Sequence, residues 1–214
     1  MDADPKQLER PSWSALASTH ASFALGNDLA RRYQPDVAPM AAVREVSDAC
    51  LQALAALMKP DEAVGLFSAE PVPANPDLNV IARKTVEQMV FEGSKGEPIA
   101  GEYVNLVPAD VPEMMKLVDL TKPGPFAART IALGSYIGIR NSDQLLAMAG
   151  ERMRFDGFTE ISAVCTHPDY TARGYASFLV GALTQNILAR GETPFLHIYS
   201  DQQTCGRPLQ TTGL

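Results

Sequence analysis

The residues best placed to do chemistry lie between positions 160 and 176. An apolar, β-rich run from Ile161 to Thr166 is followed by the break His167-Pro168-Asp169, by a turn that holds Arg173 and Gly174, and then by a helical pattern. A strand, a turn and a helix in this order bring several main-chain N–H groups to one point, where the helix dipole adds about half a positive charge. We therefore expect this turn to bind an anion such as a phosphate.

The turn reads Thr171-Ala172-Arg173-Gly174-Tyr175-Ala176. Together with the preceding strand it resembles the central motif of the GCN5-related N-acetyltransferase (GNAT) superfamily, whose turn is Arg/Gln-x-x-Gly-x-Gly/Ala and holds the pyrophosphate of acetyl-CoA through main-chain N–H groups. Gly174 and Ala176 match that pattern. Thr171 departs from it, which removes a side chain but leaves the main-chain donors. The alternative is that Gly174 only allows the helix and the strand to pack closely.

The resemblance implies an α/β protein of the GNAT fold, with a twisted, mixed, mostly antiparallel sheet flanked by helices, and acetyl-CoA as cosubstrate. The main-chain N–H of Val164 is then expected to face the acetyl oxygen, and Cys165 and Thr166 to pair through their main chains with the pantetheine arm. The cofactor-binding residues implied are Val164, Cys165, Thr166, Thr171, Ala172, Arg173, Gly174, Tyr175 and Ala176.

Moving an acetyl group from a thioester to an amine needs a neutral amine, a donor for the developing oxyanion and a proton for the leaving thiolate. Glu160, at the start of the strand, resembles the carboxylate that some members use as general base, directly or through water; alternatively, it forms a salt bridge at a surface edge. His197, on the strand predicted at 194–199, is a second candidate base or else a core histidine. Cys165 as a nucleophile has no base visibly arranged beside it.

In this superfamily the loop between the first two helices borders the acceptor site. Phe126 and Arg129 are therefore candidates for binding substrate, with a packed Phe and a solvated Arg as the plainer alternatives. His167, at the mouth of the turn, either touches a phosphate or makes a local hydrogen bond.

The second half follows the order of elements in that superfamily. We expect a strand at 103–107, a helix that Asp110 and Glu113 open as a capping box, and a second helix over 126–133. A hairpin over 136–150 comes next, and the helix after Gly174 is expected to end at Gly191.

The first half shows no constellation that suggests chemistry. We expect a helix from Ser47 and strands at 63–67 and 78–83, with 85–91 a further strand or short helix. The polar, Gly-rich stretch 92–98 predicts a boundary between a region 1–98 and a domain 99–214. In the subgroup that the sequence most resembles, the first region is a degenerate GNAT-like unit, a scaffold or a wall of the acceptor pocket.

The C-terminal end departs from the superfamily. Gln202 replaces an Asn, and Leu209 stands where a Tyr serves as general acid toward the CoA sulfur. Pro208 disfavours a helix there. The chain also stops where a last strand is usual, and the sheet edge left open suggests a homodimer.

Composition limits the partners. The formal net charge of −7 and a pI near 5.0 argue against nucleic acid. Three widely spaced cysteines, Cys50, Cys165 and Cys205, suggest reduced thiols and give no support to a metal site. The polar N-terminus and the lack of a long apolar run predict a cytoplasmic protein that does not enter membranes.

The sequence thus predicts an N-acetyltransferase that moves an acetyl group from acetyl-CoA to a small-molecule or peptide primary amine by direct attack. Two alternatives stay open. One is a non-catalytic acyl-CoA-binding or sensing protein, favoured by Leu209. The other is an interaction protein that has kept the fold and lost the cofactor, for which Thr171 and Ala172 are the argument.

Overall fold

The computed structural model describes residues 4–93, 101–142 and 144–199. The helices are η1 (Pro5–Glu9), α1 (Pro11–Ala17), η2 (Ala21–Phe23), α2 (Asp48–Ala55), η3 (Pro108–Asp110), α3 (Val111–Thr121), η4 (Thr130–Leu133), η5 (Pro168–Tyr170) and α4 (Tyr175–Ala189), where η marks a 3-10 helix. The strands are β1 (Ala24–Gly26), β2 (Ala30–Tyr33), β3 (Met40–Val43), β4 (Gly65–Leu66), β5 (Val86–Val90), β6 (Val104–Asn105), β7 (Tyr136–Asn141), β8 (Gln144–Phe155), β9 (Phe158–Thr166) and β10 (Thr193–Tyr199).

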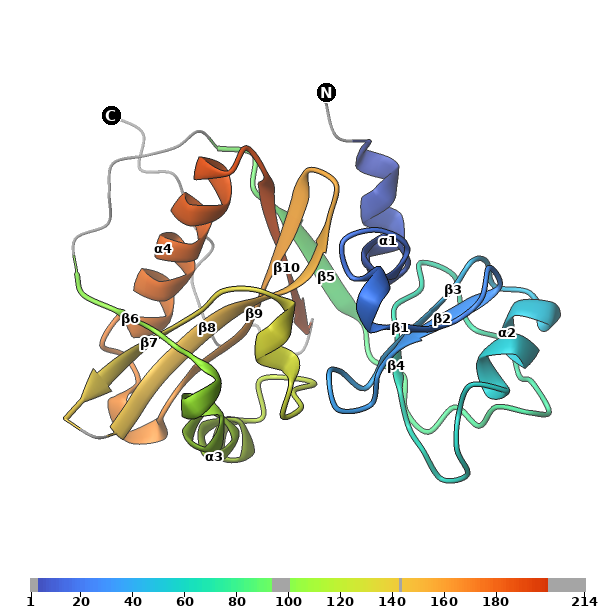
Figure 1. The fold of residues 1–214 in the computed structure, drawn as a ribbon, viewed down its shortest axis with the longest axis horizontal. Coiled ribbons are helices and arrows are strands. Elements are labelled where there is room, and N and C mark those ends of the chain that lie inside the picture. Colours follow the sequence, from blue (N-terminus) through green and yellow to red (C-terminus); the bar gives the residue numbers. More distant parts are fainter. Residues whose placement is uncertain (1–3, 94–100, 143, 200–214) are drawn as a thin grey trace.

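The strands form two sheets. The N-terminal half folds a four-stranded sheet in the order β1-β2-β3-β4, and the second sheet has six strands in the order β5-β10-β9-β8-β7-β6. Figure 1 shows α4 against one face of the larger sheet and α3 on its other side. The pairing is antiparallel throughout the larger sheet except between β10 and β9, which run parallel. The predicted α/β class, with a twisted and mostly antiparallel sheet, is confirmed.

Helices α3 and α4 each bury an apolar face against the larger sheet. Helix α4 packs Leu179, Leu183 and Ile187 onto the sheet, and α3 buries Met114 and Leu117 on the opposite side. Because both faces of β8 and β9 are covered, side chains of either parity along these strands are buried. None of the helices in the described residues combines the length and apolar character of a membrane span.

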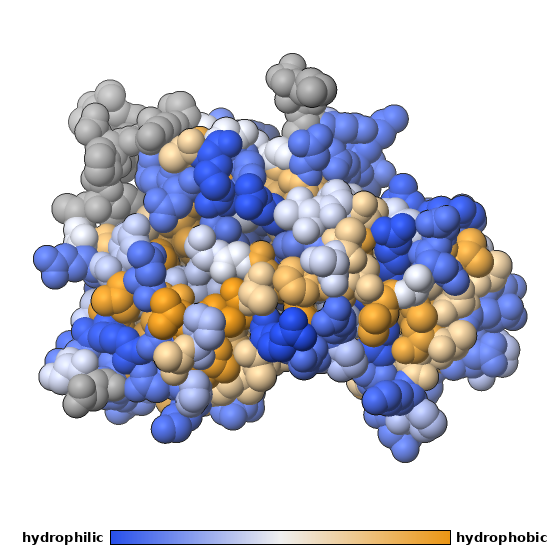
Figure 2. Space-filling model, in the orientation of Figure 1, coloured by the Kyte–Doolittle hydropathy of each residue, from blue (hydrophilic) through white to orange (hydrophobic). Residues whose placement is uncertain are grey.

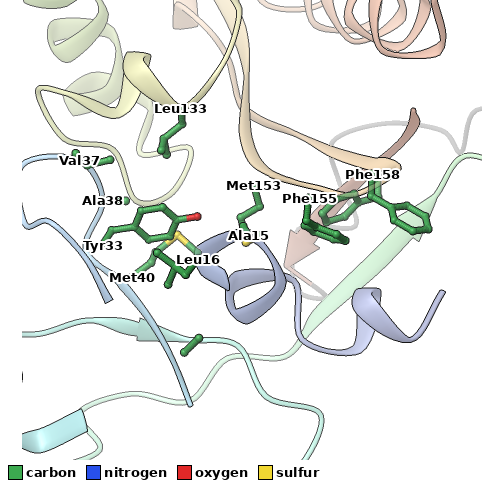
Figure 3. Close-up of a cluster of buried hydrophobic side chains, with 12 residues drawn as sticks. Ala15, Leu16, Tyr33, Val37, Ala38, Met40, Leu133, Met153, Phe155 and Phe158 are labelled. Atoms are coloured by element: carbon green, nitrogen blue, oxygen red, sulfur yellow. The ribbon is translucent and has the colours of Figure 1, made fainter. Parts of the chain in front are cut away.

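One hydrophobic core joins the two halves of the chain. Figure 3 shows Leu16 of α1 and Tyr33 of β2 on one side and Met153 and Phe155 of β8 on the other. All four side chains are almost completely buried. Since apolar burial contributes about 25 cal/mol per Å², the halves are expected to unfold together.

Strand β5 belongs to the region before the boundary predicted near residue 98 but joins the sheet of the region after it. It precedes that boundary in sequence, yet it pairs antiparallel with β10 from Val86↔Tyr199 to Val90↔Phe195. The division into 1–98 and 99–214 stays a prediction, but the six-stranded sheet draws on both sides of it. The expectation that a missing last strand leaves β10 at an open edge is wrong, because β5 occupies that place.

Helix prediction failed between α3 and β7. Instead of a helix over 126–133, only η4 forms, because the polar groups of this segment bind outside it. The main-chain N–H of Arg129 donates to the carbonyl of Asp36 (2.8 Å), and the hydroxyl of Thr130 donates to the carbonyl of Val37 (2.6 Å). Contacts with the N-terminal half thus outweigh local helix propensity.

Two smaller predictions were also wrong. Residues 78–83 form no strand. Asp110 precedes α3 without capping it, because its carboxylate accepts from the N–H of Val107 (2.8 Å) and pairs with Arg140 (2.6 Å). The predicted hairpin and the helix from Ser47 are confirmed as β7–β8 and α2.

Candidate functional site

The turn before α4 presents a row of free main-chain donors. Ala172 (φ +61°) and Gly174 (φ +81°) both have left-handed backbone, and the first helical bond runs from the N–H of Phe178 to the carbonyl of Gly174. Among the described residues, no group accepts a hydrogen bond from the N–H groups of 172–177. A helix start with alternating backbone handedness makes a concave binding place for anions.

The space in front of this turn is open. A Cβ placed on Gly174 meets no atom within 4 Å, and residues 171–174 are exposed. Thr171 closes the turn, because its hydroxyl donates to the carbonyl of Pro168 (3.0 Å). The guanidinium of Arg173 lies over the ring of Tyr170 at 5.0 Å. The donors therefore face open space, which fits a diphosphate.

Strands β9 and β10 separate beside the turn. Their parallel pairing covers Thr193↔Phe158, Pro194↔Thr159 and Phe195↔Glu160 and then stops, although β9 runs on to Thr166 and β10 to Tyr199. The result is a fork that begins at Glu160 and widens toward the turn. An extended thiol arm of CoA suits such a gap, because strand main chain can pair with it.

A bulge in β9 lies inside this fork. The register on β8 passes from Met148↔Cys165 to Gly150↔Ser162, so Ala163 and Val164 have no direct partner there. Ala163 has φ +52°, which is strained for a residue with a side chain. The bulge keeps Val164 on the α4 side of the sheet and Cys165 on the α3 side.

Glu160 is completely buried and held by two partners. Arg152 donates to both carboxylate oxygens, at 2.8 and 2.7 Å, and the Nδ1 of His197 lies 2.7 Å from Oε1. Burial acts to raise the pKa of Glu160, but Arg152 and His197 outweigh it and hold that pKa below its usual range. The carboxylate is therefore charged at neutral pH and has little tendency to take up a proton itself.

The residues that surround the Glu160 carboxylate come from three parts of the chain: β8, β10 and the N-terminal half. Arg152 and Met153 of β8 lie together opposite Glu160, because the register shifts between Glu151↔Ile161 and Arg154↔Thr159. The ring of His197 stacks on Phe67 of the N-terminal half, with centroids 4.6 Å apart, and its side chain is 7% exposed. Within the described part of the chain, Nε2 of His197 makes no hydrogen bond.

Tyr136 adds a buried hydroxyl to this region. Its ring lies against Gly150, where a Cβ would come within 2.2 Å, and the hydroxyl has no hydrogen-bond partner among the described residues. Burial raises the pKa of this phenol, with Arg152 and Glu160 close enough to influence it.

Two other predicted residues have local roles. Burial raises the pKa of the Cys165 thiol to about 11, so the thiol is protonated at neutral pH and unsuited to be a nucleophile. His167 accepts a hydrogen bond through Nδ1 from the N–H of Asp169 (3.3 Å) and begins η5.

Of the two predicted substrate residues, Arg129 lines a pocket and Phe126 does not. Arg129 lines an open, mostly apolar pocket of about 500 Å³, together with Val111 and Ile131. Phe126 lies outside that lining and packs edge-on against Tyr136 at 5.8 Å. In Figure 2, apolar side chains gather on the part of the surface where Figure 1 places β6 and α3, near this pocket.

No local pattern in the sequence points to Arg152, Phe67 or Tyr136 as members of the site. Their signal is visible only in three dimensions, since Arg152 comes from β8, Tyr136 from β7 and Phe67 from the residue after β4. Nowhere in the described ranges do three or more His, Cys, Asp or Glu side chains gather so that they could hold a metal ion. Gln202, Pro208 and Leu209 lie outside the described residues.

Comparison with known proteins identifies a matching family model and a similar solved structure. Residues 136–208 match the family model "FR47-like protein". A solved structure of a GNAT-family protein from Novosphingobium aromaticivorans DSM 12444, named as a candidate acetyltransferase, is 35% identical, with a TM-score of 0.86 over 94% of this chain and 89% of that chain. No curated relative matches in sequence.

A second solved structure shares the fold. The GCN5-related N-acetyltransferase from Kribbella flavida is 14% identical, with a TM-score of 0.56 over 92% of this chain and 86% of that chain. Three observations point to the same family: the N–H donors before α4, the fork between β9 and β10, and the 35% identity over nearly the whole length. The chain belongs to the GNAT family, whose fold is that of the acetyltransferases.

Proposed function

We propose that the protein transfers an acetyl group from acetyl-CoA to a primary amine by direct attack of the amine, without a covalent enzyme intermediate. The observation that carries this proposal is the set of N–H groups at 172–177 that find no acceptor among the described residues, in a turn whose residues 171–174 are exposed and adjacent to the fork of β9 and β10. In this proposal residues 171–176 hold the diphosphate. The strand residues Val164, Cys165 and Thr166 follow the thiol arm.

Acetyl-CoA supplies the thioester; the chain supplies position and charge. The reaction forms a C–N bond, breaks a C–S bond and moves one proton off the amine. We assign the oxyanion contact to the main-chain N–H of Val164, because the bulge at Ala163 turns this part of β9 away from regular pairing with β8. A protonated Cys165 contributes only its main chain.

Glu160 is proposed to act as base through His197. A carboxylate held by Arg152 and paired with Nδ1 fixes the orientation of the imidazole, which leaves Nε2 to take the amine proton. This relay keeps the predicted role of Glu160 while respecting its burial. With Leu209 in place of a phenol, water is proposed to protonate the thiolate.

The pocket beside Arg129 is the proposed acceptor site. Val111 and Ile131 at its surface pack on the same cluster as Ala163 and Cys165, so the pocket lies on the α3 side of the fork. Its apolar lining fits an amine with an apolar body, either a small molecule or a peptide. Arg129 is held at its rim by Asp36 (3.0 Å). We place this reaction in the cytoplasm.

One observation favours the rival function, a non-catalytic acyl-CoA-binding or sensing protein. The ion pair of Arg152 with Glu160 is fully formed and buried, which is a structural arrangement that needs no turnover. A sensor would bind acetyl-CoA at the same turn and release no thiol.

Two measurements on the full chain separate these functions. Isothermal titration with acetyl-CoA tests the binding turn, and release of free thiol across a panel of amines tests transfer. Binding with amine-dependent thiol release supports the acetyltransferase. Binding without release for every amine supports the sensor, and no binding of acetyl-CoA or CoA overturns both.

A further inference from the structure

Strand β5 forms an outer edge of the six-stranded sheet. It pairs with β10 on one side, and in the described part of the chain no strand lies on its other side. Four of its five residues, Glu87 to Val90, are exposed. An exposed strand edge carries unpaired N–H and C=O groups and is a ready place for another strand to add.

The direction of its free groups follows from one hydrogen bond. The N–H of Phe91 donates to the carbonyl of Pro194 on β10 (3.0 Å). Because N–H groups alternate in direction along a strand, Glu87 and Met89 also point toward β10. Val86, Gln88 and Val90 therefore point their N–H and C=O groups outward. Any strand added to this edge must bond to these three residues.

The charges beside this edge favour a second copy of the same strand. Lys84 precedes β5 and Glu92 follows it, and both are exposed. In an antiparallel pair of β5 strands with the two-fold axis at Gln88, Val86 lies opposite Val90 and Lys84 lies opposite Glu92, each contact occurring twice. The outward-facing residues then meet one another, as the hydrogen-bond direction requires.

Other registers are less favourable. Shifting the axis to Glu87 sets this carboxylate opposite its own copy, and shifting it to Met89 sets Glu92 opposite Val86. Like charges directly opposite destabilise a strand pair, whereas opposite charges stabilise it. Flanking charges often protect an edge from pairing, but here their signs are complementary in one register only.

Apolar side chains accompany the edge. Met89, Val90 and Ile198 of the neighbouring β10 are about 40% exposed. In the two-fold arrangement Val90 lies opposite Val86 of the other copy and Met89 lies opposite Glu87, so part of this apolar surface is covered. We propose that the protein forms a homodimer in which the β5 edges of two copies pair antiparallel about Gln88, joining two six-stranded sheets into one.

The test is a charge swap read by sedimentation equilibrium of the full chain over a range of concentrations. The wild type is expected to dimerise. Lys84→Glu and Glu92→Lys are each expected to weaken the dimer by at least about tenfold in Kd, because both contacts become like-charged. An equal mixture of the two variants is expected to form heterodimers, since every pair is then opposite in charge.

Two further variants control for folding and for general charge effects. Lys116→Glu changes the same charge on exposed α3 and is expected to leave the dimer unchanged. Val90→Pro removes one outward N–H while keeping the inward bonds, so weaker dimerisation with unchanged circular dichroism supports the pairing. A monomer at all concentrations, a dimer insensitive to these changes, or a failure of the mixture to pair overturns the proposal. So does a monomer that dimerises only when residues 200–214 are removed, which assigns the edge to that segment.

Discussion

Phe195 lies directly opposite Glu160, and this is the last pair that β10 and β9 form. The residue predicted to act on the substrate amine therefore stands where the two strands begin to separate. From this point β9 leads through the bulge at Ala163 to the turn before α4, and β10 leads to His197. The residues proposed for proton transfer and those proposed for CoA binding thus lie on two strands that separate at this pair.

Gly174→Ala tests the diphosphate turn. The open space around Gly174 leaves backbone strain at φ +81° as the main cost to folding, about 1–2 kcal/mol. Its new methyl group enters the space proposed for the diphosphate, so we expect CoA affinity to fall by at least tenfold, measured by isothermal titration. Gly191→Ala is the matched control, because Gly191 has φ +76° and equally open space at the far end of α4. Equal loss of affinity in both variants would show that strain alone is responsible.

Glu160→Gln and His197→Gln test the proposed base. Each is expected to lower kcat for thiol release by about 10²-fold or more while the Kd for acetyl-CoA changes little. The double variant is expected to lose no more kcat than either single variant, since the two residues act as a unit. Pre-steady-state thiol release with a saturating amine gives the measurement. Unchanged release after Glu160→Gln removes this residue from the mechanism, and loss of acetyl-CoA binding together with lower stability indicates a structural role.

Tyr136→Phe and Tyr33→Phe are expected to change the free energy of unfolding differently. Both rings are buried, but the hydroxyl of Tyr33 is bonded to Nδ1 of His20 (3.0 Å), whereas that of Tyr136 has no partner among the described residues. Removing a bonded hydroxyl costs about 1 kcal/mol, and removing an unsatisfied one is neutral or stabilising. Urea unfolding of both variants measures the difference. A Tyr136 variant at least 1 kcal/mol less stable would reveal a partner that the described residues do not supply.

The ion pair between Glu62 and Arg32 is expected to make the fold less stable in acid. Hydrogen bonds from the Arg32 side chain lower the pKa of Glu62 to about 2, from an ordinary value of 4.5. Because the folded pKa is the lower one, the ion pair stabilises the fold fully above pH 4.5, and this contribution is lost as the pH falls toward 2. The free energy of unfolding should therefore fall less steeply in Glu62→Gln over this window. An unchanged slope in Glu62→Gln would show that this ion pair does not cause the loss of stability in acid.

Local patterns were enough to predict the elements that carry the motif. The strand 161–166, the turn with Gly174 and the helix that ends at Gly191 are each specified by neighbours in sequence, and the structure contains them as β9, the turn and α4. Prediction failed where distant contacts decide the local structure. Arg129 and Thr130 bond to the N-terminal half, so the expected helix over 126–133 is reduced to η4.

The sequence by itself determined that a strand, a left-handed turn and a helix would meet at residues 161–189, because φ preferences and apolar periodicity act over a few residues. Only the tertiary structure decided what surrounds Glu160. Arg152 reaches it through a bulge in β8, His197 comes from a parallel strand, and Phe67 covers that histidine from the other half of the chain. A bulge changes which side chains face each other, and this depends on the pairing of whole strands, which no local pattern contains.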